Sequence, residues 1–247
     1  MPEPEPASGP LILATTIPTA RLSEWTFLQP SRACRSLVPV CLALTRTTKL
    51  TTFSIPPNVE FQVDDVEDEW TYSKPFDYIH SRAMNGAVID WATFFKRAYA
   101  NLTPGGWFES QEFGLMTCDD GTIDGTSLAT GLEIIDKGSK VLGRPFIKVW
   151  EMRHWMEEAG FVNVSESHYH WASNTWPRDK KLKELGIWNN MNISQGLEGF
   201  MMGVGTRALG WQPEEIKVLA AKSLTELNDR RIHAYWPINV LYGQKPE

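Results

Sequence analysis

The stretch NLTPGGWFESQEF, residues 101–113, marks a sharp passage from a helix to a strand. Pro104 fixes its own φ and has no amide hydrogen, and Gly105 and Gly106 place no side-chain restriction on the backbone. The residues that follow alternate large apolar with polar side chains, which is typical of a strand with two different faces. This junction predicts a helix that ends at TPGG and a strand over GGWFESQEF.

The segments before this junction continue the same pattern. VEFQV at residues 59–63 predicts a strand that ends in the acidic turn DDVEDEW, and FDYIHSR at residues 76–82 predicts a second strand. Asp90 is a suitable N-cap for the helix between them and the junction. The apolar residues of that helix share one stripe, formed by Trp91, Phe94, Phe95, Ala98 and Leu102. Strand, helix and strand in this order predict a parallel α/β sheet.

The second half of the chain predicts four helices and two strands. The helical patterns cover about residues 124–141, 146–159, 180–202 and 214–227, and the strand patterns cover residues 162–172 and 234–243. Two late strands separated by a helical insert, after a parallel βαβ run, describe a doubly wound sheet whose last pair is antiparallel. The fold class that the sequence predicts is therefore α/β.

Composition changes near residue 58. No Asp or Glu occurs in residues 25–59, whereas DDVEDE follows at residues 64–69. We therefore predict a divergent, poorly packed lead-in at residues 1–57 and one α/β domain at residues 58–247. The helices at about residues 179–228 interrupt the late strands and are predicted to form a helical cap.

Overall composition excludes several classes of function. A formal charge of -6 and a pI near 5.5 argue against a nucleic-acid surface. Cys34, Cys41 and Cys118 cannot form a complete disulfide framework and lack the C-x-x-C spacing of zinc sites. The longest nearly apolar run, LVPVCLAL, is far shorter than the roughly 20 residues of a membrane helix. We expect a cytoplasmic or nuclear protein with no nucleic-acid or membrane partner.

Ligands of open α/β sheets bind outside the carboxyl ends of the strands. Asp64 and Asp65 close the first predicted strand, and His80, Ser81 and Arg82 close the second. A carboxylate in this position can accept a hydrogen bond from an exocyclic amine, and a following backbone amide can donate to a ring nitrogen. We expect both groups of residues to lie along one edge of the sheet, with TPGG at the opposite edge.

Three further motifs have weaker functional interpretations. The G-x-G at residues 203–205 lies in a helical pattern, so close helix packing is favoured over a cofactor loop. The H-x-H at residues 168–170 has no evident third ligand, and we predict no metal site. CDDGT at residues 118–122 predicts a turn, although its place after the third strand can also bring it to the mouth of a pocket.

Several spaced motifs together resemble one family. FDYIHSR, DWATFFKRAYANLTPGGWFESQEF and DRRIHAYWPINVLYGQKPE are similar to segments of the fungal LaeA-like S-adenosylmethionine-dependent methyltransferases of secondary metabolism. The similarity runs from about residue 57 to residue 247. It implies a class I methyltransferase fold, which is a Rossmann-like sheet of seven strands with a reversed final hairpin and a helical cap over the acceptor pocket. It also implies S-adenosyl-L-methionine as the cofactor.

The resemblance assigns cofactor-binding roles position by position. Asp65 matches the residue that accepts from the adenine amino group, Val66 matches the one whose backbone amide faces the ring, and residues 80–82 match the loop beside the sulfonium. The implied cofactor-binding residues are Asp64, Asp65, Val66, His80, Ser81 and Arg82. No catalytic residue is predicted, because methyl transfer needs mainly alignment and exclusion of water.

This sequence departs from the family pattern at its N-terminal end. The family begins with a glycine-rich turn of the type D-I-G-T-G-T-G and a following strand that ends in an acid, whereas here Gly9 is the only glycine before residue 58. Losing about three hydrogen bonds of roughly 1.5 kcal/mol each would weaken cofactor binding about a thousandfold. LILATTI at residues 11–17 or VPVCLALT at residues 38–45 can replace the missing central strand, but neither supplies the turn.

Three interpretations follow. The first is a methyltransferase with a small-molecule or protein acceptor that acts in, or regulates, fungal secondary-metabolite biosynthesis. The second is a non-catalytic methyltransferase-like accessory or regulatory protein that has lost cofactor binding and works through a protein partner. The third is that residues 1–57 come from a misread exon. By resemblance we favour methyltransferase as the class, and the acceptor stays open.

Overall fold

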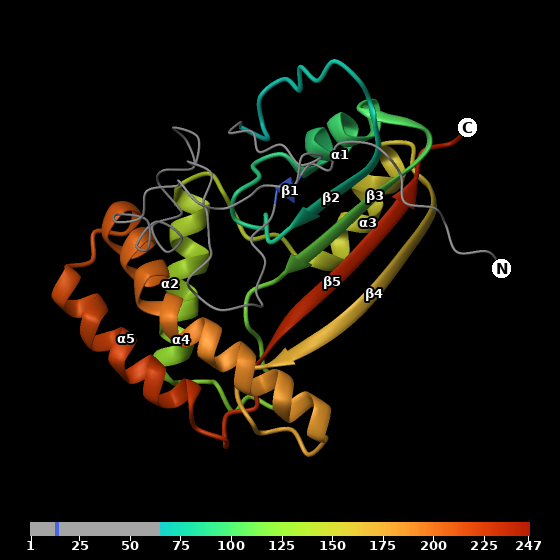
Figure 1. Ribbon diagram of the computed structural model, residues 1–247. Coiled ribbons are helices and arrows are strands. Elements are labelled where there is room, and N and C mark those ends of the chain that lie inside the picture. The colour runs from blue at the N-terminus through green and yellow to red at the C-terminus, as the bar shows by residue number, and fades with distance from the viewer. Residues whose placement is uncertain (1–12, 15–64) are drawn as a thin grey trace, which may run out of the picture.

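The computed structural model describes residues 13–14 and 65–247 of the chain, and these residues form one five-stranded sheet (Figure 1). The strand order is β1-β2-β3-β5-β4. The first three strands pair in parallel, whereas β5 is antiparallel to both of its neighbours. The strands are β1 (Leu13–Ala14), β2 (Phe76–Arg82), β3 (Leu102–Phe113), β4 (Val162–Ala172) and β5 (Tyr235–Gln244). The predicted α/β class and the antiparallel last pair are confirmed.

The place beside β2 is filled from the N-terminal part of the chain. The backbone of Leu13 pairs with His80 and that of Ala14 with Ser81, so these two residues of the predicted segment 11–17 form a strand there, and its other residues lie outside the described ones. The predicted strand at residues 59–63 and the alternative at residues 38–45 lie outside the described residues.

The helices form two groups around this sheet. Helices α1 and α3 pack on one face of the sheet, and α2, α4 and α5 lie beyond the carboxyl ends of β2 and β3 (Figure 1). The helices are α1 (Trp91–Ala100), α2 (Ser127–Val141), the short 3-10 helix η2 (Val149–Glu151), α3 (Met152–Glu158), α4 (Lys180–Ala208) and α5 (Pro213–Leu227). Within residues 65–247, every helix is too short or too polar to span a lipid bilayer.

The helix-to-strand junction forms differently from the expectation. Asp90 is the N-cap of α1, and its side chain accepts a hydrogen bond from the Thr93 amide at 3.0 Å, as predicted. The helix ends at Ala100, however, and Leu102 opposite Phe76 already begins β3, so the expected continuation of the helical stripe to Leu102 is wrong. Strand pairing with β2 therefore begins before TPGG.

TPGG forms a bulge inside β3 at the edge opposite the carboxyl ends of β2 and β3. The pairing register shifts between Phe76 and Tyr78, and Gly105 has a φ of +79°. A Cβ at Gly106 would lie 3.0 Å from the Asp77 carbonyl oxygen, so only glycine fits without displacement. The Gly105 amide donates to the Lys245 carbonyl at 3.0 Å, which holds the chain end after β5. The turn is scaffold, as predicted.

Two hydrophobic cores hold these groups of helices. Phe95 of α1 and Met156 of α3 pack with Phe108 on one face of the sheet, and all three are almost fully buried. The second core lies between α2, α4 and α5 and includes Leu128 and Met201. We call the three helices of this second core the cap.

Small residues let the cap helices approach closely. A Cβ at Gly205 of α4 would lie 2.7 Å from Ile216 Cδ1 of α5, and a Cβ at Gly138 of α2 would lie 2.8 Å from Val204 Cβ of α4. This is the close helix packing predicted for the G-x-G at residues 203–205. Helix α4 also continues to Ala208, past the end expected near residue 202.

The most demanding glycine of the cap is Gly186, where α4 meets the segment after β4. A Cβ at this position would overlap the backbone carbonyl oxygen of Asn174, which cannot rotate away as a flexible side chain can. We predict that Gly186→Ala lowers the free energy of unfolding by about 1–3 kcal/mol, because α4 must shift away from the end of β4. Urea denaturation followed by circular dichroism measures this change.

Gln195→Ala is the matched control for this prediction. Gln195 lies on an exposed face of the same helix, so its replacement should change stability by less than about 0.5 kcal/mol. Equal stabilities of the Gly186→Ala and Gln195→Ala variants would contradict the packing described here.

Candidate active site

The three residues expected to close β2 lie on two different faces of the sheet. His80 and Arg82 are half-buried on one face, whereas Ser81 points into the core, where it is 2% exposed and its hydroxyl lies 3.1 Å from that of Ser110. This split follows from the alternation of side chains along a strand. The side chains of His80 and Arg82, but not that of Ser81, are therefore open to the face away from α1.

A hydrogen-bonded strip surrounds His80 on that face. Glu109 on β3 is the pairing partner of His80. Its Oε1 lies 3.8 Å from His80 Nδ1, and its Oε2 accepts from the Tyr78 hydroxyl at 2.6 Å. Burial lowers the pKa of His80, and the Glu109 carboxylate only partly opposes this effect. Burial and Glu109 both raise the pKa of Tyr78. At neutral pH His80 is therefore a neutral group that can accept or donate a hydrogen bond.

Glu112 at the end of β3 holds the loop that follows β2. We call residues 83–90 the rim loop. Glu112 is 1% exposed, and its Oε2 accepts from the amides of Met84 at 2.7 Å and Asn85 at 2.9 Å. Ala83 next to them has a φ of +56°, a conformation that an L-residue adopts only when its neighbours hold it. Glu112 therefore fixes the carboxyl edge of the sheet.

The ionisation of Glu112 is set by opposing effects. Its burial raises the pKa to about 8, even though the two amide hydrogen bonds and the nearby Arg82 favour the charged form. Its Oε1 is buried without a hydrogen-bond partner in the described part of the chain. The loss of hydration of the carboxylate outweighs the two bonds that it gains.

The acidic turn that follows the first predicted strand is bonded to the same loop. Asp65 Oδ1 accepts from the Glu67 amide at 3.0 Å, and the Val66 carbonyl accepts from Trp70 Nε1 at 3.0 Å. Glu67 Oε1 accepts from the Ile89 amide in the rim loop at 2.7 Å. The structure thus joins the turn of Asp65 and Val66 to the end of β2, while Asp64 lies outside the described residues.

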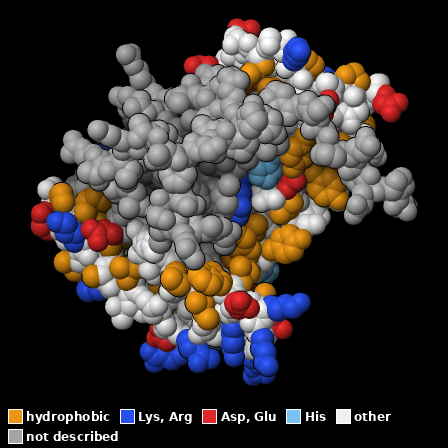
Figure 2. Space-filling model, in the orientation of Figure 1, with side chains coloured by type: hydrophobic (Ala, Val, Ile, Leu, Met, Phe, Trp, Pro, Cys, Tyr) orange, Lys and Arg blue, Asp and Glu red, His pale blue; other side chains and the backbone are white. Residues whose placement is uncertain are grey.

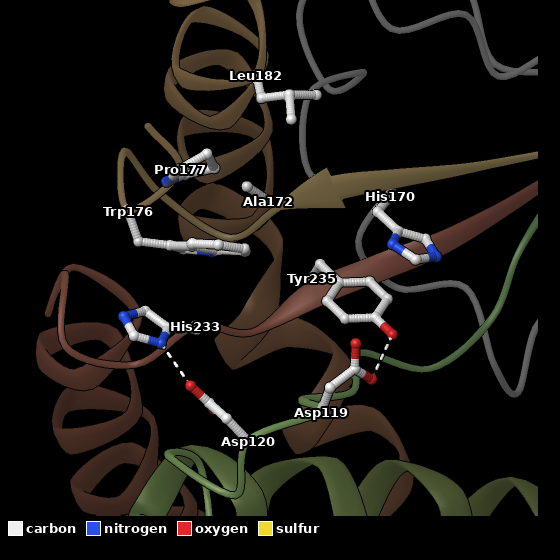
Figure 3. A pocket seen from close by; sticks show the side chains of 9 residues that line it. All are labelled: Asp119, Asp120, His170, Ala172, Trp176, Pro177, Leu182, His233 and Tyr235. Carbon is white, nitrogen blue, oxygen red and sulfur yellow. Dashed lines mark hydrogen bonds and ion pairs between the residues drawn. The ribbon is translucent and has the colours of Figure 1, made fainter. Parts of the chain in front are cut away.

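A pocket of about 260 Å³ opens at the carboxyl edge, where β4 ends and β5 begins (Figure 3). Three segments that are distant in sequence supply its walls: the turn after β3, the end of β4 together with the residues that lead into α4, and the start of β5. The lining residues are Asp119, Asp120, His170, Ala172, Trp176, Pro177, Leu182, His233 and Tyr235.

Hydrogen bonds fix the polar groups of this pocket. The Tyr235 hydroxyl donates to Asp119 Oδ1 at 2.7 Å, and burial together with this bond raises the pKa of Tyr235 to about 12. His233 Nδ1 lies 2.6 Å from Asp120 Oδ2. Hydrogen bonds hold the pKa of Asp120 well below its usual range, and the bond from Cys118 has the largest effect, followed by that from His233. Asp120 is therefore a carboxylate at neutral pH, and the pocket holds two acidic side chains next to each other.

Only part of this pocket was visible in the sequence. CDDGT forms a turn and also reaches the pocket mouth, so both of its interpretations hold. Of the H-x-H motif, His170 lines the pocket, whereas the His168 side chain is 52% exposed beside Glu166. Within residues 13–14 and 65–247, no three His, Cys, Asp or Glu side chains are grouped to hold a metal ion. Trp176 and His233 gave no local signal, because only the fold brings them together.

Glu112 was also missed, although it lies in the stretch that decides the junction. The signal was present. The inward positions of β3 are Phe108, Ser110 and Glu112, so the alternation itself places a carboxylate in the core. A buried acid at the carboxyl end of a strand is a candidate for fixing or performing function.

A methyltransferase domain family matches residues 20–166 of the chain. The match begins inside the segment 1–57, so the boundary expected near residue 58 stays a prediction. "Probable methyltransferase tdiE" from Emericella nidulans is 39% identical over 184 residues, which cover 74% of this chain and 58% of that protein. "Methyltransferase pytC" from Aspergillus terreus is 37% identical over 193 residues, which cover 77% and 60%.

A secondary metabolism regulator from Cochliobolus heterostrophus is 31% identical over 199 residues, which cover 78% of this chain and 65% of that protein. The chain therefore spans about three fifths of the length of these curated relatives. Among solved structures, the cyclopropane synthase MmaA2 from Mycobacterium tuberculosis gives a TM-score of 0.45 at 14% identity over 78% of this chain and 62% of that chain. That likeness is too distant to decide anything further about this chain.

The raised pKa of Glu112 makes a prediction about stability. A carboxyl group whose pKa is about 8 in the folded state and 4.5 otherwise binds its proton more tightly when the chain is folded. Its contribution to the free energy of unfolding is therefore largest below about pH 4.5 and is lost as the pH rises towards 8. Each pKa unit is worth about 1.4 kcal/mol, so we expect a change on the order of a few kcal/mol.

Glu112→Gln should remove most of this pH dependence, because the amide of glutamine does not titrate. Its oxygen can still accept from the Met84 and Asn85 amides, so the rim loop is kept. Urea denaturation between pH 5 and 9, buffered at constant ionic strength, measures the effect. Glu133→Gln is the control, since Glu133 is an exposed helix residue paired with Lys137. Parallel pH profiles for the parent chain and Glu112→Gln would contradict the raised pKa.

Proposed function

Because the chain belongs to the methyltransferase domain family, we propose that it transfers a methyl group from S-adenosyl-L-methionine to a small-molecule or protein acceptor. S-adenosyl-L-methionine is the cofactor of this family. Its relatives include methyltransferases and regulators of fungal secondary metabolism, and we place its activity in that context, in the cytoplasm or nucleus. The observation that carries the proposal is the pocket at the end of β4 and the start of β5, at the edge of the sheet where α/β proteins bind ligands.

The described residues fit the adenosine end of the cofactor. Among them, no acceptor lies on the Val66 amide, so this amide is available for a ring nitrogen. Asp65 lies beside it in a turn that Trp70 and Glu67 hold in place. His80 stands on the open face of β2. We propose that Asp65 and Val66 bind the adenine ring and that His80 and Arg82 face the rest of the cofactor.

When bound, the cofactor supplies an electrophilic methyl group on its sulfonium. The chain's own residues align the acceptor and keep water out, which is the main protein contribution to such a displacement. Glu112 supports this alignment by fixing the rim loop through two backbone amides. Trp176 and Pro177, which precede α4, and Leu182 of α4 cover the pocket.

One observation favours a second candidate function. The family's glycine-rich turn brings backbone amides close to the amino-acid end of the cofactor, and Gly9 is the only glycine before residue 58. A chain without these contacts would keep the cap and pocket but bind the cofactor about a thousandfold more weakly. The alternative is therefore a methyltransferase-like accessory or regulatory protein without turnover.

Calorimetric titration of the full chain with S-adenosyl-L-methionine tests the proposal. We expect a micromolar dissociation constant. Asp65→Asn should weaken binding about tenfold or more, because a charge-assisted hydrogen bond is worth about 1.5–3 kcal/mol. Asparagine can still accept from the Glu67 amide, so the turn itself is kept.

Asp68→Asn is the matched control, because Asp68 is exposed in the same turn and its loss removes the same charge. Circular dichroism melts show whether each variant is folded. Binding that the two variants weaken equally would contradict the role of Asp65. If the folded chain does not bind the cofactor at concentrations up to about millimolar, this result contradicts methyl transfer and favours the accessory protein.

A further inference from the structure

The pocket at the end of β4 and the start of β5 is walled by two pairs of aromatic rings. His170 stacks on Tyr235, with 4.2 Å between ring centroids and an angle of 22° between the ring planes. Trp176 packs against His233 with 5.1 Å between centroids. Figure 3 shows these pairs on opposite sides of the pocket, with Leu182 at its other end. Such walls suit a flat apolar molecule, since ring faces offer a large and rigid contact area.

A carboxylate with a free oxygen stands at one end of this space. Asp119 Oδ1 accepts from Tyr235, whereas no donor in the described part of the chain lies on Asp119 Oδ2. Asp120 beside it is already occupied by His233 and Thr122. The lining contains neither Lys nor Arg. Asp119 therefore offers an unneutralised charge and an open acceptor to the pocket.

The position of Asp119 is fixed before any ligand arrives. Thr117 and Tyr235 exchange two backbone hydrogen bonds of 2.9 Å, which tie the turn after β3 to the start of β5. Trp176 is held by a hydrogen bond from its Nε1 to the Ala234 carbonyl at 2.9 Å. Groups that are already ordered lose little conformational entropy on binding, so they favour affinity.

We propose that this pocket binds an organic amine, whose flat apolar body lies between the two ring pairs and whose protonated nitrogen donates to Asp119 Oδ2. The rings add to this preference, because a cation near an aromatic face is attracted by the ring's charge distribution. A pocket of about 260 Å³ admits an amine that carries a single aromatic ring. The identity of this amine as the methyl acceptor rests on the proposed function, whereas its binding does not.

Basic residues near the pocket provide the contrasting case. Arg178, Lys180 and Lys181 are exposed around the start of α4, outside the pocket lining. Figure 2 shows Lys and Arg side chains gathered at the lower end of the molecule, where α4 starts in Figure 1. These residues would attract an anionic ligand to the surface, so an anionic analogue must be tested beside the amine.

Three probes of one shape separate charge from shape: 2-phenylethylamine, 2-phenylethanol and phenylacetate. Each is titrated into the full chain by calorimetry at pH 7, in the absence of cofactor. We expect the amine to bind at least about tenfold more tightly than the alcohol, because the bond to Asp119 is charge-assisted. Phenylacetate should bind most weakly of the three.

Asp119→Asn should abolish the preference for the amine and leave the affinity for the alcohol unchanged. The asparagine oxygen can still accept from Tyr235, so the pocket wall is kept. Asp124→Asn is the matched control, since Asp124 is an exposed carboxylate in the same loop but outside the pocket lining. This variant should retain the full preference for the amine.

The proposal is overturned if the amine does not bind, if the three probes bind equally, or if Asp124→Asn loses as much preference as Asp119→Asn. A cofactor titration on the same samples separates the two proposals. Amine binding without cofactor binding supports the amine site and contradicts methyl transfer. Cofactor binding without amine binding supports methyl transfer and overturns the amine site alone.

Discussion

The buried carboxyl group of Glu112 is the constraint on which the rim loop and the acidic turn depend. It lies at the end of the central strand β3 and holds two amides of the rim loop, which in turn bonds the acidic turn through Glu67. Burying an acid with one unpartnered oxygen is unfavourable by itself. The hydrogen bonds to the rim loop and the protonation that burial favours offset this cost. The carboxyl edge beside β2 and β3 is thereby fixed to the core of the sheet.

The cap is held by a different physical principle, which is close approach of helix backbones. Gly138 and Gly205 remove the side chains that would keep α2, α4 and α5 apart, and Gly186 lets α4 touch the end of β4. Because α4 contacts the end of β4 at Gly186, the start of α4 lies over the end of β4, where the pocket opens. Packing of apolar surface thus places the start of α4 at the pocket.

Local patterns predicted much of this fold and little of the pocket. Asp90 could be identified as an N-cap and residues 76–82 and 162–172 as strands, because capping and side-chain alternation depend only on neighbours in sequence. The bulge at TPGG was missed because it is set by pairing with β2. Ser81 was grouped with His80 by proximity in sequence, whereas alternation separates their side chains. The pocket draws on three distant segments, which no local pattern connects.

The pocket and the residues proposed to bind the cofactor depend on different parts of the chain. Asp119, Trp176 and Tyr235 are held by contacts among residues 117–235, and within the described part of the chain none of their hydrogen bonds involves the acidic turn or the rim loop. Loss of the glycine-rich turn would remove binding energy for the cofactor without removing any of these contacts. A chain that had lost methyl transfer would therefore keep a formed, negatively charged aromatic pocket. Ligand binding and turnover are separable properties of this fold, and each must be measured on its own.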